Sequence, residues 1–569
     1  MAANRSMTKL LNAFDAVNNK VTFDSDSSVT SASKGSNLGA GISTVTNVSD
    51  LPSVAQAYSK ILVTGTNTLY QYSTGGWYPI AIINNFNPAF TTSPNGTYEL
   101  SRTGAATTVT VLATDSDDVP IQYITITDSN FDTFATITHD SDKHNVFTVI
   151  PIDSDGSNSG AKSGVVTFRA SDGVNVSNAN STFTLSFGPD WSAVPTKTKI
   201  ITGPRASALY GLGSVCTNSD GTYVGARDHN IPGGNNYEIW YKSGGSWSKQ
   251  ATLNPTGGNG PANNYQSAGM SDDADYLVLG DQNSAKAFVY YRTGTSWALQ
   301  QTITCPIANE ADFGWSCDMS GDGNYFIVSD RSSTSSDYGG QAWVYKRSGT
   351  SWSVEQQLTQ PSSSSNYGYS VCIDKTGTYA FVGDWAYNSD TGRGYIWTRS
   401  GTTWTLQQTI AGSTTASGDR FGSVSAISGN GEHLAINAPY DDDGATSSGT
   451  VFMFSRSGTT WTQRAAITPG ANANGVTGEY GIGIDDAGEN VVFSHTISSV
   501  KTMFVYSRSG NTWSQTRQLA GIDGAEQYTN GMTGGRAMSG DGKVIFSGAY
   551  YNNDGSNQGA GAVYEFVSG

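Results

Sequence analysis

The sequence lacks any apolar run long enough to cross a bilayer, and its opening residues, MAANRSMTK, lack the apolar core of a secretory signal peptide. We therefore expect no membrane insertion and no export by that route. The four cysteines, Cys216, Cys305, Cys317 and Cys372, contain no CxxC pair, which argues against a zinc site. We expect them on strands as small buried residues, because an unpaired cysteine packs like a small hydrophobe.

Charged residues are also scarce, at 14% of the chain, and acidic residues outnumber basic ones by 47 to 31. The formal charge of −16 repels phosphate backbones, so we expect no nucleic-acid partner. The five histidines have no metal-binding spacing such as HExxH, and neither a G-x-S-x-G elbow nor a phosphate-binding loop occurs. We therefore expect no catalytic residues and no resident cofactor apart from the calcium considered below.

What the chain has in quantity is glycine, 67 of its 569 residues, together with 11% aromatic residues. Long helical runs are missing, so the composition predicts an all-β fold of short strands joined by tight turns. The exception is MTKLLNAFDAVNNKV at residues 7–21, for which we expect a short helix. The length suggests more than one domain.

One phrase recurs along the second half of the chain. It reads YKRSGTSWSVEQQL at residues 345–358, and its copies share a glycine followed three residues later by a tryptophan. An acidic or glycine-rich turn such as SGDG precedes each copy. The tryptophans are Trp247, Trp297, Trp352, Trp404, Trp461 and Trp513, and the turns, one more in number, end at Gly221, Ala274, Gly323, Gly377, Gly431, Gly488 and Gly542.

Each repeat contains four short alternating stretches rich in aromatic and β-branched residues, which predict four strands. Four strands in a period near 50 residues are typical of a β-propeller blade. The seventh copy ends after its third strand, and TKTKIITGP at residues 196–204 resembles the missing fourth. We therefore predict a seven-bladed propeller over residues 191–569 with 1+3 ring closure, in which residues 191–204 supply the outer strand of the last blade.

The recurring phrase has two interpretations, a ligand-binding motif or a structural joint used once per blade. We favour the joint. Ser348 and Gly349 would form the hairpin turn between the third and fourth strands, and Trp352 would pack against its own or the next blade. Arg347 would stack on that indole or pair with a neighbouring acid.

The region upstream of the repeats differs in composition. Residues 91–190 show alternating strands at regular spacing, a pattern typical of a β-sandwich of roughly 100 residues. Their sequence, with ATDSDD and ASDG at strand ends, resembles immunoglobulin-like and cadherin-like modules. Residues 1–90 hold the expected helix and a small β-meander at residues 59–83, and we assign them to attachment or oligomerisation.

Two further resemblances extend this prediction. Residues 421–458, with Phe421-Gly422, Ala438-Pro439 and an acidic glycine loop, resemble an FG-GAP propeller repeat of the integrin α-subunit kind. Residues 45–190 resemble virion structural proteins of marine cyanophages and related tailed phages. That resemblance implies a virion protein made in the host cytoplasm, with other virion proteins as partners.

Calcium is a candidate ligand at two places in the chain. FG-GAP repeats often carry a DxDxDG calcium loop, but the turns here are shortened to SGDG or DKTG, so we expect no calcium in the propeller. In the sandwich, Asp115, Asp117, Asp118 and Asp172 are either the ligands of a calcium ion, as the cadherin-like resemblance implies, or ordinary turn formers.

The loops after each second strand vary most, and variable loops on a rigid scaffold are where recognition usually lies. Tyr338, Trp385, Tyr387 and Tyr440 are the candidate binding residues there, with local packing as the alternative. We expect them to contact a host-surface glycan or protein.

An enzyme is the main alternative. Sialidases also build propellers and carry an Asp-box at the same turn, but the aspartate position holds Arg347, Arg399, Arg456 and Arg508 here. The carboxylates of Asp441, Asp442 and Asp443 are interpreted as solvated turn residues. The sequence therefore predicts a non-enzymatic, homo-oligomeric virion protein, a tail, neck or capsid appendage or fibre; a glycan-processing enzyme and a bacterial adhesin are the alternatives.

Overall fold

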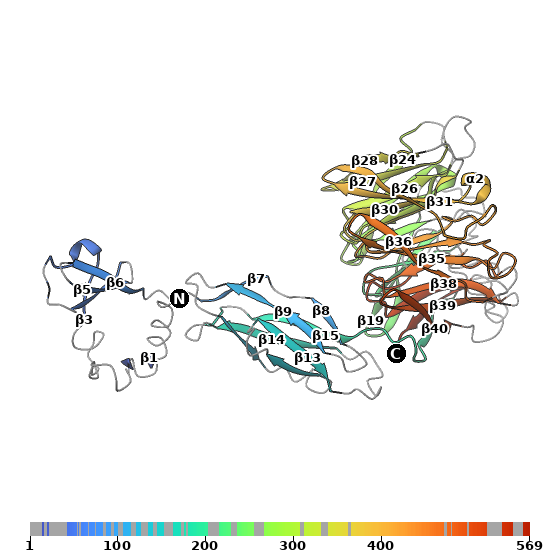
Figure 1. Ribbon diagram of the computed structural model, residues 1–569. Coiled ribbons are helices and arrows are strands. Elements are labelled where there is room, and N and C mark those ends of the chain that lie inside the picture. Colours follow the sequence, from blue (N-terminus) through green and yellow to red (C-terminus); the bar gives the residue numbers. More distant parts are fainter. Residues whose placement is uncertain are drawn as a thin grey trace. The chain divides into compact units, whose positions relative to one another are not determined.

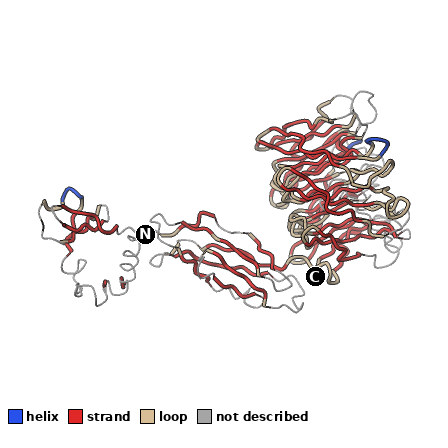
Figure 2. The backbone as a smooth tube through the Cα atoms, viewed as in Figure 1, coloured by secondary structure: helices blue, strands red, loops and turns tan. Residues whose placement is uncertain are grey.

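In a computed structural model, strands account for nearly all of the regular structure (Figures 1 and 2). The structure describes residues 14–15, 20–21, 42–53, 55, 59–65, 68–73, 76–82, 87–92, 96–100, 106–114, 121–126, 135–139, 145–152, 163–171, 176–177, 180–202, 215–228, 236–254, 267–307, 312–331, 339–361, 366–470, 475–478, 481–497, 500–519, 537–549 and 561–569. The chain divides into two compact units, Met1–Phe187 and Gly188–Gly569. Helical turns in the described part are limited to η1 (Val48–Asp50), η2 (Gln282–Ser284) and α2 (Tyr387–Asp390).

The predicted N-terminal helix is wrong where it can be checked. Phe14–Asp15 (β1) and Lys20–Val21 (β2) pair as short antiparallel strands, and the rest of residues 7–21 lies outside the described residues. The sequence between them contains two consecutive asparagines, which are weak helix formers and frequent in turns.

After β1 and β2, the first unit contains a small sheet of order β3-β4-β5-β6. Its strands are β3 (Ile42–Val45), β4 (Lys60–Val63), β5 (Thr68–Ser73) and β6 (Gly76–Ile82). β3 pairs parallel with β4, whereas β4, β5 and β6 form an antiparallel meander.

The rest of the first unit is a β-sandwich. One sheet has the order β11-β14-β15-β8 and the other β12-β13-β9, with β10 paired to β7. Phe147 of one sheet lies 5.5 Å and 5.9 Å from the rings of Phe168 and Phe183 of the other, so the two sheets share one core. The strands are β7 (Ala89–Thr92), β8 (Thr97–Leu100), β9 (Thr107–Thr110), β10 (Leu112–Thr114), β11 (Gln122–Ile126), β12 (Ala135–His139), β13 (Val146–Pro151), β14 (Ser163–Ser171) and β15 (Ser181–Phe187).

The second unit consists of consecutive antiparallel sheets, which we call blades 1 to 7 in chain order. In blades 1 to 6 four strands follow one another from inner to outer edge. The strands of blades 1 to 3 are β17 (Val215–Thr217), β18 (Tyr223–Asp228), β19 (Asn236–Ser243), β20 (Ser246–Leu253), β21 (Ala268–Met270), β22 (Tyr276–Asp281), β23 (Lys286–Thr293), β24 (Ser296–Thr304), β25 (Phe313–Met319), β26 (Tyr325–Asp330), β27 (Gln341–Ser348) and β28 (Ser351–Leu358).

Blades 4 to 6 continue this order, and blade 7 is built differently. Its three named strands have the order β16-β42-β41, so its outer strand comes from upstream of blade 1. The remaining strands are β29 (Tyr367–Ile373), β30 (Tyr379–Asp384), β31 (Arg393–Ser400), β32 (Thr403–Ile410), β33 (Ser425–Ile427), β34 (His433–Ala438), β35 (Thr450–Ser457), β36 (Thr460–Ile467), β37 (Ile482–Ile484), β38 (Asn490–Ile497), β39 (Val500–Ser509), β40 (Thr512–Leu519), β16 (Thr196–Thr202), β41 (Val544–Ala549) and β42 (Ala562–Val567).

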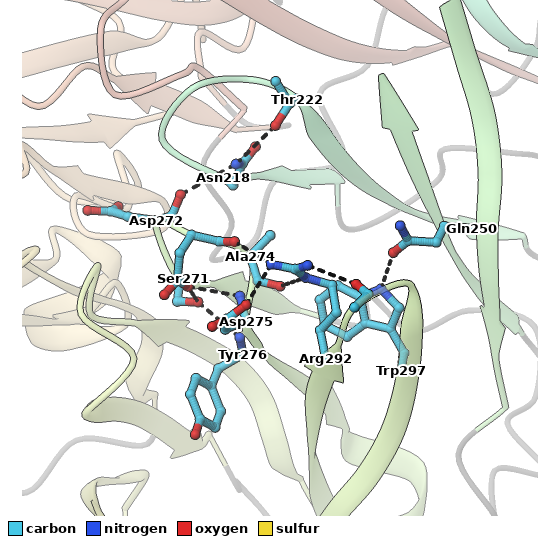
Figure 3. A network of polar contacts seen from close by, with 12 residues as sticks. Asn218, Thr222, Gln250, Ser271, Asp272, Ala274, Asp275, Tyr276, Arg292 and Trp297 are labelled. Carbon is cyan, nitrogen blue, oxygen red and sulfur yellow. Dashed lines mark hydrogen bonds and ion pairs between the residues drawn. The ribbon is translucent and has the colours of Figure 1, made fainter. Parts of the chain in front are cut away.

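The repeated arginine and tryptophan join neighbouring blades. The indole of Trp297 in blade 2 donates from Nε1 to Oε1 of Gln250 in blade 1 at 2.7 Å (Figure 3). Arg292 bonds the carbonyl oxygen of Ala274 in its own blade at 2.8 Å, and its guanidinium lies 4.9 Å from the ring centroid of Tyr223 in blade 1. The phrase is therefore a joint, as expected, but the tryptophan reaches the preceding blade and the arginine stacks on that blade's tyrosine, not on the indole.

A glutamine reinforces the same joint. Oε1 of Gln356 accepts a hydrogen bond from the Trp404 backbone N–H, and Nε2 of Gln356 donates to the Trp404 carbonyl, both at 2.7 Å. The glutamine side chain thus imitates one rung of a β-ladder between the outer strands of blades 3 and 4. The same pair of bonds joins Gln301 to Trp352 and Gln408 to Trp461.

At the contact between blades 7 and 1, which we call the seam, residues outside the repeated phrase take the positions of its hydrogen-bond partners. The indole of Trp247 donates to Glu565 of β42 at 3.1 Å, and Lys242 pairs with the same carboxylate at 2.5 Å. Trp191, which is 1% exposed, fills the tryptophan position that the seventh copy lacks. Its carbonyl accepts from Nε of Arg517 at 2.9 Å, and Arg517 stands in blade 6 where Gln408 stands in blade 4.

The turns between the first and second strands form a closed circle of backbone hydrogen bonds. Within that circle, Nζ of Lys375 lies 2.6 Å from Oδ2 of Asp272 and 3.1 Å from Oδ2 of Asp486. The bonds run from the N–H of one turn to the carbonyl of another: Ser219 to Asp272, Asp272 to Gly321, Asp322 to Lys375, Lys375 to Gly429, Asn430 to Asp486, Asp486 to Gly540, and Gly540 to Ser219.

Candidate binding surface

One edge of the blades collects the variable loops. Because each blade is an antiparallel meander, the first strand begins at the same edge where the second strand ends and the third begins. The opposite edge carries the circle of turns and the hairpins of the repeated phrase. Residues at the loop edge therefore take no part in the joint formed by the repeated phrase, and their sequence can vary from blade to blade.

A row of alternating aromatic and arginine side chains crosses this edge over blades 3, 4 and 5. The guanidinium of Arg331 lies 3.4 Å from the ring centroid of Trp315, and that ring lies 5.2 Å from Tyr369. Tyr369 in turn meets Trp385 edge to face at 5.7 Å. We call the row formed by Trp315, Arg331, Tyr369, Trp385, Arg420 and Tyr440 the aromatic–arginine row.

Arg420 joins the last two aromatic residues. Its guanidinium carbon lies 4.4 Å from the ring centroid of Trp385 and 4.9 Å from that of Tyr440. Cation–π contacts of this kind are worth about 0.5–1 kcal/mol each at exposed sites. Trp315 is buried, whereas the other five members are half-buried and leave part of their surface open to a partner.

The arginines of the row are partly neutralised. Arg331 pairs with Asp312 at 3.3 Å, and Arg420 pairs with Asp390 at 3.6 Å. The row therefore presents planar aromatic and guanidinium groups without a large local excess of positive charge. Such a surface favours stacking and hydrogen bonding over the attraction of polyanions.

The backbone at Arg420 and in the loop that it contacts adopts left-handed conformations. Asn388, Ser389 and Asp390 have φ of 51°, 59° and 63°, and Arg420 has φ of 62°. These left-handed conformations cost non-glycine residues on the order of 1–3 kcal/mol each and are found at ligand-binding sites more often than elsewhere. The Arg420 N–H donates to the Asp390 carbonyl at 2.8 Å, which ties the two loops together.

A buried carboxyl lies next to Tyr440. Asp441 is 0% exposed; its Oδ1 accepts from the Asp443 N–H and from Thr450, while its Oδ2 has no hydrogen-bond partner. Burial, reinforced by the charges of Asp443 and Asp419, raises the pKa of Asp441 to about 6. Burial also raises the pKa of Asp419, which is 4% exposed. The interpretation of Asp441 as a solvated turn residue is therefore wrong, because the loop folds its side chain inward.

The structure brings two of the predicted binding residues together. Trp385 and Tyr440 both stack on Arg420, while Tyr387 belongs to a separate stack in which the guanidinium of Arg393 lies 3.3 Å from its ring centroid. Tyr338 and the predicted calcium ligands Asp115, Asp117, Asp118 and Asp172 lie outside the described residues.

Sequence reasoning missed the other members of the row. Trp315 and Tyr369 each stand third in the first strand of a blade, and Arg331 and Arg420 lie in loops that gave no motif. A comparison of equivalent positions between blades 3 and 4 would have revealed the two aromatic residues. The arginines follow no such repeat.

In the part of the chain that the structure describes, no three His, Cys, Asp or Glu side chains are grouped to hold a metal ion. No helix among those residues is long and apolar enough to cross a bilayer. Cys216, Cys317 and Cys372 are buried and unpaired as expected, while Cys305 is half-buried; burial raises the pKa of the Cys216 and Cys317 thiols to about 12.

The successive sheets and their joints define the second unit as a β-propeller. Residues 404–454 match the family model of the FG-GAP repeat. The matched segment contains the Phe421-Gly422 and Ala438-Pro439 pairs. A search of the curated proteins found no match.

Solved structures with a similar arrangement share little sequence with this chain. The β-propeller domain of Cps50 (Swd1) from Myceliophteria thermophila is 12% identical, with a TM-score of 0.44, over 66% of this chain and 100% of that one. Hydrazine synthase from Kuenenia stuttgartiensis is 11% identical, with a TM-score of 0.44, over 65% and 97%. The C-terminal WD40 domain of Sif2 is 13% identical, with a TM-score of 0.40, over 66% and 100%. With values this low, these likenesses carry no conclusion about function.

Proposed function

We propose that this chain is a non-enzymatic virion structural protein of a tailed phage, an appendage or fibre that displays a closed, seven-bladed propeller and binds a protein partner through the aromatic–arginine row. The row is the observation that carries the binding role. Trp, Tyr and Arg are the residue types that dominate binding energy at protein interfaces, and here they form one contiguous set on the variable edge.

The geometry of the ring supports the propeller as a rigid carrier. The strand pairing of β16 with β42 and the circle of turns support a closed ring in which every blade has two neighbours. A rigid carrier holds the loops of blades 3, 4 and 5 in fixed relation, which lowers the entropy lost when a partner binds. The resemblance of residues 45–190 to cyanophage virion proteins supports an immunoglobulin-like spacer and a place on a phage particle.

A non-enzymatic role is supported by the carboxyls at the loop edge. A glycosidase needs two carboxyl groups that reach the scissile bond. Asp419 and Asp441, the pair with raised pKa near the row, are 4% and 0% exposed. Their burial keeps a substrate away from both.

Two experiments test the proposal. Mass spectrometry of purified phage particles should detect this chain, and its absence from particles would overturn the virion role. For binding, the purified chain is incubated with host cells, and the fraction that sediments with them is measured. Trp385→Ala and Arg420→Ala should each weaken sedimentation at least about tenfold, while Val354→Ala, an exposed change on the outer strand of blade 3, should not.

Pretreatment of the cells distinguishes the partner class. Protease treatment should abolish binding if the partner is a protein. Loss of binding after periodate oxidation alone would instead favour a glycan. Release of reducing sugar by the wild-type chain would favour the enzymatic alternative.

A further inference from the structure

Residues 188–202 are the stretch of chain through which the first unit is joined to the propeller. β15 ends at Phe187, which is buried in the sandwich core, and β16 begins at Thr196 as the outer strand of blade 7. No hairpin turn connects β16 to β42, whereas β27 and β28 of blade 3 are joined by the turn at Gly349. A pull on the first unit therefore reaches the propeller at an outer strand that only noncovalent contacts attach to its own blade.

The pairing of β16 with β42 is by itself a weak attachment. The ladder changes register between Lys199 and Ile201. Of the six side chains from Thr196 to Ile201, only that of Ile201 is buried, whereas β28 buries both Trp352 and Leu358. Because apolar burial is the main force that holds an outer strand against its blade, β16 is held less firmly than β28.

A stronger attachment lies just upstream of β16. Trp191 is 1% exposed and packs among apolar side chains of blades 6 and 7, which include Val505 and Tyr564. Its indole Nε1 donates to the Gly542 carbonyl, in a turn of blade 7, at 2.9 Å. Trp352 is the second residue of β28, but Trp191 lies five residues before β16 begins. Contacts other than the β16–β42 ladder therefore hold Trp191 in place.

Blade 6 holds the same stretch by its backbone. Nε of Arg517 donates to the Trp191 carbonyl at 2.9 Å, and Nη2 of Arg517 donates to the Ser192 carbonyl. The stretch is also folded on itself, because Oδ1 of Asp190 accepts from the backbone N–H groups of Ser192 at 3.0 Å and of Ala193 at 3.3 Å. Residues 190–193, which we call the latch, are thus fastened to two blades at once.

The latch precedes β16 on the path that tension takes along the chain. Phe187 is 0% exposed within the sandwich and Trp191 is 1% exposed within the propeller, and three residues separate these two buried anchors. Tension from the first unit therefore acts on the latch before it can act on the β16–β42 ladder. Where two attachments follow one another along a chain, the second stays relaxed until the first gives way.

We propose that residues 190–193 form a mechanical latch, which carries tension between the first unit and the propeller and keeps that tension off the pairing of β16 with β42. While the latch holds, blade 7 keeps its outer strand. When the latch gives way, β16 follows and blade 7 is left without it. This role belongs to the linker between the two units and is independent of the binding role proposed for the aromatic–arginine row.

Single-molecule stretching of the full-length chain tests the latch directly. One handle is attached at the N-terminus and the other at Val354→Cys, an exposed position in blade 3, in a Cys305→Ser background because Cys305 is half-buried. Release of the latch and β16 frees residues 190–202, at most about 4–5 nm of chain at about 3.5 Å per residue, whereas unfolding of the sandwich frees a much longer length. At a fixed force, Arg517→Ala should shorten the time to this release about tenfold, because two hydrogen bonds to the latch are lost.

Gln408→Ala is the matched control for Arg517→Ala. Gln408 makes the corresponding pair of bonds to the backbone of Trp461 between blades 4 and 5 and touches neither the latch nor β16. In denaturant without force, the two variants should lose comparable free energies of unfolding. Under force, Gln408→Ala should leave the time to release unchanged. A time that Arg517→Ala does not change, or that both variants shorten equally, would overturn the proposal.

A change within β16 separates the latch from the ladder. Ile201→Val trims the buried side chain of the strand and leaves the latch intact, so the time to release at fixed force should stay that of the wild type. Trp191→Phe keeps an aromatic ring in the core but deletes the donor to Gly542, and should shorten that time. A time that Ile201→Val shortens and Trp191→Phe does not would assign the tension to the ladder and contradict the latch.

Discussion

The guanidinium carbon of Arg347 lies 4.6 Å from the ring centroid of Tyr276, a residue of the preceding blade. The same relationship recurs between Arg399 and Tyr325 at 4.2 Å and between Arg456 and Tyr379 at 4.3 Å. In each case the arginine also bonds carbonyl oxygens of two turns in its own blade. One side chain therefore fixes the hairpin, the inner turn and the neighbouring blade together.

Replacing this arginine should lower stability. Nε of Arg347 donates to the Gly323 carbonyl at 2.8 Å, and Nη2 donates to Oδ1 of Asn324 at 2.5 Å. Arg347→Ala should reduce the free energy of unfolding by about 1–3 kcal/mol, measured by chemical denaturation. Arg347→Lys should recover only part of this, because an ammonium lacks the planar fork.

Lys346 supplies the control for that variant. It follows Tyr345 on the same strand, but it pairs with Glu355 at 3.6 Å with a side chain that is 43% exposed. Lys346→Ala should therefore reduce the free energy of unfolding by less than Arg347→Ala does. An equal effect of the two variants would contradict the special role of the arginine.

Removing a joint tryptophan should cost more. Trp352→Ala deletes a 4%-exposed indole that lies 5.0 Å from Phe326 and 6.0 Å from Tyr276, and should destabilise by about 3–5 kcal/mol. Trp191→Ala should have an effect of the same size, because Trp191 fills the same position in blade 7 although it lies before the first repeat. A change below about 1 kcal/mol at Trp191 would show that the seam does not depend on it.

These two residues also show what the sequence could and could not reveal. The register of Trp352 follows from the repeat itself, since glycine, tryptophan and alternating apolar positions recur at every blade and strand pairing is local. Trp191 lies outside any recognisable copy of the phrase and ten residues before Ile201, so its place depends on a long-range contact that no local pattern encodes.

The candidate site divides in the same way. Trp385 and Tyr440 were predicted because large aromatic residues in variable loops are conspicuous. Arg420 was not, because a lone arginine in a loop normally points into solvent, and only the positive φ of 62° and the folding of two loops place it between the two rings. The direction of stacking in the joints was missed for the same reason: spacing along the chain does not say which blade a side chain faces.

Acid should weaken the contact between blades 5 and 6. Burial lowers the pKa of His433 and of His495 to about 4, and the charges of Arg508 and Arg464 add to this at His433. An unfolded histidine has a pKa near 6.5, so between about pH 6.5 and 4 the unfolded chain binds more protons. Each histidine's contribution is therefore complete above about pH 6.5 and is lost as the pH falls, by up to a few kcal/mol.

His433→Tyr isolates this effect. His433 begins the second strand of blade 5, where blades 1 to 4 have a tyrosine on which the arginine of the following blade stacks. The variant should therefore give Arg508 a phenol ring in the same place. The buried carboxyls of Asp441 and Asp485, with pKa values raised by burial to about 6 and 7, act in the opposite sense on acidification. The quantity to measure is thus the difference in unfolding free energy between variant and wild type, which should grow from pH 7 to pH 4; a difference independent of pH would contradict the assignment.

Lys375 should stabilise the centre of the ring in a salt-dependent manner. It lies between Asp272 and Asp486, and although burial alone would lower its pKa, these two carboxylates raise it. Lys375→Gln leaves two like charges facing one another and should lower the free energy of unfolding, by no more than about 1 kcal/mol because the lysine is 41% exposed. Added salt should shrink the difference from wild type, since partly exposed charges are screened.

Lys543→Gln, which breaks a pair with Asp541 inside a single turn, should have a smaller effect at low salt. Equal effects of the two variants, or a Lys375→Gln difference that salt does not change, would show that the triad does not bind the turns of different blades together.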